Sequence, residues 1–97
     1  MDKREQKEKL LSVCRELFRD TGVDLDLIEY VHFVDDLGMD SITFISLVVE
    51  LEAQFQLEVP DEMLLIENFE DFDKTMETLT TILSAEEKRG ESGDDKT

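Results

Sequence analysis

The chain has 97 residues, which is enough for one domain with a modest hydrophobic core and leaves no room for a second. Its 26 acidic and 10 basic residues give a formal net charge of -16, so we expect its surface to repel nucleic acid and anionic lipid and to attract basic partners. The single cysteine, Cys14, excludes an intramolecular disulfide and a zinc site with several thiolates, and it favours a reducing, cytoplasmic setting.

The first predicted element is an amphipathic helix from about residue 4 to residue 19. The N-terminal sequence, residues 1–18, is charged from its second residue and lacks the apolar run and the small-residue cleavage site of a secretory signal. Charged residues fill one face of the helix, and Thr21-Gly22 ends it. The other face carries apolar residues that recur at helical spacing and should be buried. These are Leu10, Val13, Cys14, Leu17 and Phe18.

The next segment, from Val23 to Met39, has scattered apolar residues without a sustained period. We interpret it as a long ordered loop that its apolar residues hold on the core, although such a length indicates either a functional loop or an unrecognised element. His32, the only histidine, is expected at a surface or partly packed position and not as a catalytic base. The apolar residues are Leu25, Leu27, Ile28, Tyr30, Val31, Phe33, Val34 and Leu37.

A second helix is predicted from Asp40-Ser41 to about Gln56, because either of the first two residues can cap the free amides with a side-chain oxygen. At 100° per residue, its apolar side chains fall on two nearly opposite faces, of which only one can face the bundle. The core face contains Phe44, Leu47, Val48, Leu51 and Phe55, and the second face contains Ile42, Ile45 and Val49 and continues toward Glu52. The second face is either exposed for docking or covered by the long loop or the third helix.

Two further helices complete the predicted fold. A short one begins at Pro60-Asp61-Glu62 and ends near Ile66. Asn68 caps the last helix, in which Phe72, Met76, Leu79 and Leu83 repeat at helical spacing. The fold class is therefore all-α, a four-helix bundle with three long helices, a short third helix and a long first loop. The polar sequence after about Ala85 predicts a domain of residues 1–86 and a disordered tail of residues 87–97.

The most informative stretch is DLGMDSI, residues 36–42. A serine in the first turn of a helix, as Ser41 would be, lies at the positive end of the helix dipole, a favourable place for a phosphodiester. Gly38 permits the tight turn before it. Asp35, Asp36 and Asp40 would repel the phosphate and offer anchor points for a basic partner. No histidine or lysine stands near Ser41 in sequence, so we expect no catalytic residue; the plain alternative is that Asp40-Ser41 is only a helix cap.

This stretch resembles the attachment signature of the acyl carrier protein family, an acidic D-L-G-x-D-S-[LI] segment at the start of the second helix. The resemblance extends from about Leu10 to Leu83 and includes Pro60 at the short third helix. It implies that Ser41 carries 4′-phosphopantetheine covalently and that the chain is not an enzyme. The implied partners are a phosphopantetheinyl transferase, which supplies the base and the metal for attachment, and acyl-loading and acyl-processing enzymes with basic docking patches. The candidate docking residues are Asp36, Asp40, Ile42, Ile45, Val49 and Glu52.

The pathway and two other classes stay open. Carriers of fatty-acid synthesis usually have further acids in the first two turns after the serine, whereas this chain has Thr43 and Ser46 there. We expect fatty-acid or related lipid or polyketide biosynthesis, with a D-alanyl or other specialised carrier as the alternative. A calcium loop starting at Asp35 fails because Asp40 stands where glycine is required, so no metal site is predicted. The two non-carrier alternatives are a calcium-responsive helical protein and a plain protein–protein interaction module, which together describe an acidic, cation-binding helical interaction module. We expect a soluble monomer that does not bind nucleic acid. We also expect no membrane insertion, because no apolar run is long enough to span a bilayer.

Overall fold

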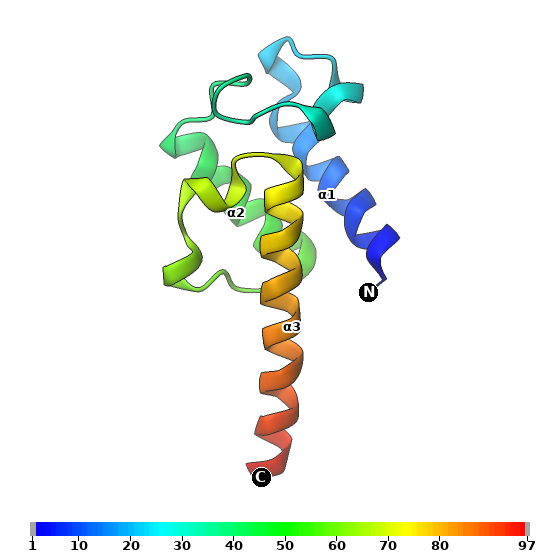
Figure 1. Cartoon of the computed structure of the whole chain (residues 1–97), viewed down its shortest axis with the longest axis vertical. Helices are drawn as coiled ribbons and strands as arrows, with labels where there is room; N and C mark the ends of the chain where they lie inside the picture. Colours follow the sequence, from blue (N-terminus) through cyan, green and yellow to red (C-terminus); the bar gives the residue numbers. More distant parts are fainter. Residues whose placement is uncertain (1, 97) are drawn as a thin grey trace.

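A computed structural model of the chain describes residues 2–96, and it describes the side chains of residues 2–86. Three α-helices alternate with short 3₁₀ helices, and no strand occurs within the described range, which confirms the all-α prediction. The elements in chain order are α1 (Lys3–Leu17), η1 (Arg19–Thr21), η2 (Leu25–Tyr30), α2 (Ser41–Phe55), η3 (Asp61–Met63), η4 (Ile66–Phe69) and α3 (Phe72–Lys96). Figure 1 shows α1, α2 and the first half of α3 gathered together, with the second half of α3 extending beyond them.

α1 begins at a side-chain cap, since Asp2 Oδ1 accepts the N–H of Glu5 at 2.8 Å. The helix ends at Leu17, two residues earlier than predicted, because η1 follows and winds more tightly. Gly22, at a φ of 84°, then turns the chain in a conformation that favours glycine. The predicted core face of α1 is confirmed: Leu10, Val13, Cys14 and Phe18 are buried, and Leu17 packs against them.

The long loop contains a helical segment that the sequence analysis did not recognise, η2. Ile28, Phe33 and Met39 are buried and hold the loop on the core as predicted, with the ring of Phe33 packed 4.9 Å from that of Phe18. Leu27 and Tyr30, in contrast, are 48% and 78% exposed, and the prediction for these two was wrong. Residues three apart eclipse in a 3₁₀ helix, so Leu27 and Tyr30 share the outward side.

α2 agrees with its predicted bounds to within one residue. It starts at Ser41, after the cap residue Asp40, and ends at Phe55, where Gln56 takes a left-handed conformation with a φ of 53°. All five residues of the predicted core face are buried: Phe44, Leu47, Val48, Leu51 and Phe55.

The short third helix is present as two 3₁₀ helices instead of one α-helix. Pro60 precedes η3 in an extended conformation and does not occupy its first turn. Leu64, with a ψ of 60°, and the extended Leu65 separate η3 from η4. The side-chain amide of Asn68 donates to the carbonyl of Met63 at 3.1 Å, so it holds these turns together.

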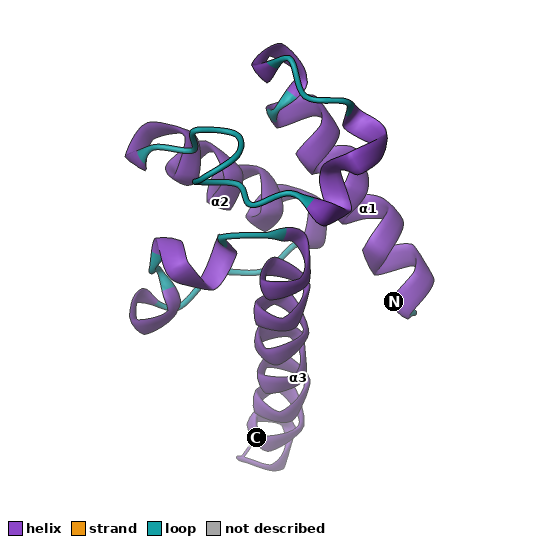
Figure 2. Ribbon diagram, turned by 45° about the horizontal axis from the view of Figure 1, so that its top comes forward, coloured by secondary structure: helices purple, strands orange, loops and turns teal. Residues whose placement is uncertain are grey.

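Asn68 was predicted to cap the last helix, but its side chain binds Met63 instead, so that prediction was wrong. Asp71 caps the helix, since its Oδ1 accepts the N–H of Lys74 at 2.7 Å. α3 continues to Lys96, past the end expected near Ala85, and Figure 2 shows it leading away from the other helices. The side chains beyond residue 86 lie outside the described residues, so the division into a domain of 1–86 and a tail of 87–97 stays a prediction. Within residues 2–96, no helix is long and apolar enough to cross a membrane.

Candidate functional site

Ser41 is the first residue of α2, and Asp40 is its cap. The Oδ1 atom of Asp40 accepts the N–H of Thr43 at 2.9 Å, and its carbonyl accepts the N–H of Phe44 at 2.8 Å. The hydrogen bond from Thr43 lowers the pKa of Asp40, so this carboxylate is charged at neutral pH. The sequence allowed either Asp40 or Ser41 to cap this helix, and in the structure Asp40 does so. Ser41 is exposed, and its hydroxyl has no hydrogen-bond partner in the described part of the chain.

A closed loop presents the start of α2 at the surface. The N–H of Met39 donates to the carbonyl of Phe33 at 2.9 Å, and both side chains are buried. Inside this closure, the N–H of Gly38 donates to the carbonyl of Val34 at 3.0 Å. Gly38 has a φ of 70°, a left-handed conformation that other residues adopt only with strain. The turn predicted at Gly38 is therefore present, and Ser41 lies two residues after the buried Met39.

His32 connects this loop to the start of α3. Its Nε2 lies 3.2 Å from Glu70 Oε2, and its Nδ1 accepts the N–H of Asp35 at 3.0 Å. Because Nδ1 accepts, we assign the ring proton to Nε2, which donates it to Glu70. The backbone adds a bond from the N–H of Phe33 to the carbonyl of Glu70 at 2.7 Å. His32 is partly packed, as predicted, and both ring nitrogens have structural partners, so it does not serve Ser41 as a base.

Each of the three predicted acidic docking residues accepts a backbone hydrogen bond. Asp40 caps α2, and the Oδ2 of Asp36 accepts the N–H of His32 at 2.7 Å, yet both residues are exposed. Glu52 is only partly exposed, and its Oε2 accepts the N–H of Val59 at 2.9 Å. Glu52 therefore holds the segment after α2 in place. Sequence reasoning missed this contact because Glu52 and Val59 belong to different elements.

The second apolar face of α2 is exposed. Ile42 is 78% exposed, and Ile45 and Val49 are each 55% exposed. Neither the long loop nor the third helix covers these three residues, which we call the exposed stripe. The stripe begins next to Ser41 in sequence and follows the helix away from it, so a protein that reaches Ser41 would also meet the stripe.

The remaining reactive groups do not form a second site. Burial raises the pKa of the Cys14 thiol to about 12, which makes it unreactive, as expected for a core cysteine. Among the side chains that the structure describes, no cluster of three or more His, Cys, Asp or Glu is arranged to hold a metal ion. The chemistry of this surface therefore centres on the Ser41 hydroxyl.

Comparisons with known proteins show the family to which this chain is similar. Residues 9–72 match the family described as phosphopantetheine attachment site, and this range contains all of α2 and the loop before it. The chain is also 38% identical over 72 residues to an acyl carrier protein of Bdellovibrio bacteriovorus. That alignment covers 73% of this chain and 81% of the Bdellovibrio protein.

Proposed function

Because this chain belongs to the acyl carrier protein family and contains a phosphopantetheine attachment domain, we propose that Ser41 is the residue that carries the 4′-phosphopantetheine arm. The chain is a carrier and not an enzyme. The observation that carries the proposal is the hydroxyl of Ser41 at the first position of α2, inside the DLGMDSI segment, which is exposed and has no hydrogen-bond partner among the described residues. When bound, the arm supplies a thiol that holds acyl intermediates as thioesters.

The residues around Ser41 fit a phosphodiester at this position. The start of α2 places the positive end of the helix dipole beside the hydroxyl, which stabilises a nearby negative charge. Asp35, Asp36 and Asp40 are exposed on the preceding loop and repel the same phosphate. The start of α2 thus stabilises a phosphate on its first residue. The acidic loop, in contrast, disfavours a position of the phosphopantetheine arm along the loop.

The activation of Ser41 must come from a partner. From Asp20 to Asp73 the chain has no lysine, and the nitrogens of His32 are bonded to Glu70 and Asp35. The carboxylate of Asp40, beside Ser41, is a weak base because the hydrogen bond from Thr43 lowers its pKa. A serine hydroxyl needs a nearby base to become a nucleophile. We therefore assign the proton acceptor to a phosphopantetheinyl transferase, the partner that loads the arm.

Partner enzymes are proposed to dock on the exposed stripe together with Asp36 and Asp40. An apolar patch beside charged residues is typical of an interaction surface, and the acidic field of this chain steers basic surfaces toward it. Self-repulsion at a net charge of -16 supports a monomer, and the unpaired, buried Cys14 supports a reducing cytoplasmic setting.

The proposed pathway is fatty-acid or related lipid or polyketide biosynthesis. A specialised carrier, for D-alanyl or other acyl groups, is the second candidate. The observation that favours it is the absence of acidic residues in the first two turns of α2, where Thr43 and Ser46 stand. Transfer assays with purified loading enzymes of each class would distinguish the two.

Intact mass after incubation with a phosphopantetheinyl transferase, coenzyme A and magnesium tests the attachment residue. We expect wild type to gain one phosphopantetheine and Ser41→Ala to gain none, with unchanged helix content by circular dichroism. Ser46→Ala, which removes an exposed hydroxyl from the same helix, is the matched control and should load normally. Loading of Ser41→Ala, or failure of wild type to load, would refute the assignment.

A further inference from the structure

The ring of His32 faces two different groups of one residue in the acidic loop, the segment of residues 33–39 that precedes Ser41. Its Nδ1 accepts the N–H of Asp35 at 3.0 Å, and Asp35 Oδ2 lies 3.7 Å from the same nitrogen. Nδ1 accepts from the backbone N–H only while it carries no proton, and it donates to the carboxylate only when it carries one. The protonation state of His32 therefore decides which group of Asp35 the ring binds.

Carboxylates surround this ring on each element that packs against it. A hollow of about 370 Å³ opens beside His32, between η2, the acidic loop and the start of α3. The titratable groups that line it with His32 are Glu29, Tyr30, Asp36, Asp71 and Asp73. Glu70 binds the other ring nitrogen at 3.2 Å, and Glu29 is paired with Lys7 of α1 at 3.1 Å. Among the described residues, no lysine or arginine lines the hollow.

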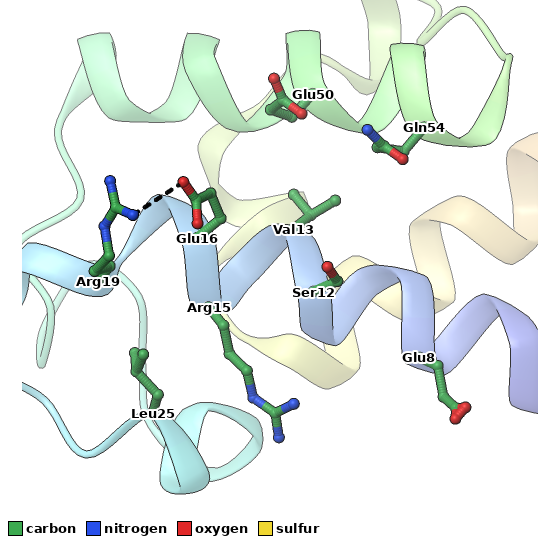
Figure 3. A pocket seen from close by; sticks show the side chains of 9 residues that line it. All are labelled: Glu8, Ser12, Val13, Arg15, Glu16, Arg19, Leu25, Glu50 and Gln54. Atoms are coloured by element: carbon green, nitrogen blue, oxygen red, sulfur yellow. Dashed lines mark ion pairs between the residues drawn. The ribbon is translucent and has the colours of Figure 1, made fainter.

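The charge of this surface thus depends on His32. From Asp20 to Asp73, His32 is the only residue whose side chain can become cationic. The hollow between α1 and α2 differs, because Figure 3 shows Arg15 and Arg19 on it, with Arg19 paired to Glu16. Histidine is the side chain that ordinarily changes charge between pH 5 and 8. The His32 side chain is 31% exposed, so solvent protons reach it.

We propose that His32 is a positioning residue for the acidic loop and holds the loop in place for the transferase only while its ring is neutral. A solvent proton that adds to Nδ1 displaces the N–H of Asp35, and the new N–H donates to Asp35 Oδ2. The bond from Nε2 to Glu70 is kept in both states. The Asp35 side chain, 79% exposed in the neutral state, then lies on the ring, and the loop presents one negative charge fewer.

Ser41 does not move in this exchange. The bonds from Met39 to Phe33 and from Gly38 to Val34, which close the loop, do not involve the His32 ring. Protonation should therefore raise the KM of the transferase for the chain, because a basic partner meets less negative charge, and leave kcat unchanged. This role deepens the proposed function, and it rests on that function only for the loading measurements.

A titration of the full-length wild type by ¹⁵N NMR, from about pH 8 to about pH 5.5, tests the exchange without any loading. At the high end, the ring nitrogen shifts should place the proton on Nε2. As the pH falls, the Asp35 amide should shift with the same midpoint as the ring, because it loses its acceptor. A neutral ring protonated on Nδ1, or an Asp35 amide that does not follow the ring, would overturn the inference.

Two variants that do not titrate separate the contacts of the ring. In His32→Asn, the side-chain oxygen replaces Nδ1 and can accept the N–H of Asp35 at every pH. In His32→Gln, the side-chain amide can reach Glu70 but leaves that N–H without its acceptor. The Asp35 amide should stop titrating in both variants and should keep its high-pH shift only in His32→Asn. Thermal melts show that each variant is folded.

Loading kinetics supply the functional measurement. The KM of wild type divided by that of His32→Asn cancels the titration of the transferase itself. This ratio should be about one at high pH and rise to about twofold to fivefold at low pH, the effect of one exposed charge contact, with equal kcat values. A ratio that is the same at both pH values, or a change in kcat instead of KM, would overturn the positioning role. A wild type that shows the NMR exchange but never gains the arm refutes the proposed function alone.

Discussion

Replacing Ile45 by glutamate tests whether the exposed stripe is free of the core. Complete burial of an isoleucine side chain contributes about 1.5–3 kcal/mol, and Ile45 is 55% exposed, so its buried part contributes about 1 kcal/mol. The methylene groups of glutamate retain some of that burial. Ile45→Glu should therefore lower the free energy of unfolding by no more than about 1 kcal/mol. Leu47, two residues along α2, is fully buried, and Leu47→Ala should cost about 2–5 kcal/mol.

Thermal unfolding by circular dichroism compares the two variants. For a domain of this size, 1 kcal/mol shifts the Tm by about 4–8 °C, so Ile45→Glu should lower the Tm by a few degrees and Leu47→Ala by about 8 °C or more. The KM of the transferase for Ile45→Glu should rise, because a docking contact is lost. A Tm loss as large as that of Leu47→Ala would show that Ile45 belongs to the core. An unchanged KM would remove Ile45 from the docking surface.

Three further predictions follow from charge and burial. Sixteen acidic residues without a basic residue lie between Asp20 and Asp73, so added salt or millimolar magnesium should raise the Tm by screening; a flat or falling Tm would contradict this. Folding lowers the pKa of Asp40, so its contribution to stability is complete above its ordinary pKa of 3.8 and is lost as the pH falls through the lower folded value. Asp40→Asn keeps an acceptor for Thr43 and should flatten this part of the acid-unfolding curve, whereas an unchanged curve would argue against the effect. The pKa of Cys14 is about 12, so a thiol reagent should modify it only after unfolding; rapid modification of the native protein would show that α1 opens.

The best-predicted element is α2, because the signals that define it are local. Asp40 can cap it, the spacing from Phe44 to Phe55 separates its buried face from its exposed face, and both faces lie where the helical period places them. The third helix also has a local start signal in Pro60 and the acids after it. Its geometry is decided by contacts between turns, above all the bond from Asn68 to Met63, which no pattern of neighbouring residues reveals.

The same distinction applies to the site. Ser41 and the exposed stripe follow from a motif and a helical period, and both are readable in one short stretch of chain. The bond between His32 and Glu70 joins residues 38 positions apart, and the bond from Val59 to Glu52 joins α2 to the segment that follows it. Such contacts form only when the elements pack together, so the sequence did not reveal the support behind the acidic loop or the hold of Glu52 on the segment after α2.

The bond from Met39 to Phe33 fixes the two ends of the acidic loop independently of the residues between them. The entropic cost of closing a loop grows slowly, by about 0.6 kcal/mol for each doubling of its length. Residues inserted between Asp35 and Asp36 would interrupt the three hydrogen bonds that Asp36 and Leu37 make with His32, but they would leave the buried anchors and Ser41 in place. The loop interior is thus a region where carriers of this fold can diverge, or be engineered, to change which enzymes accept them while the attachment residue stays where it is.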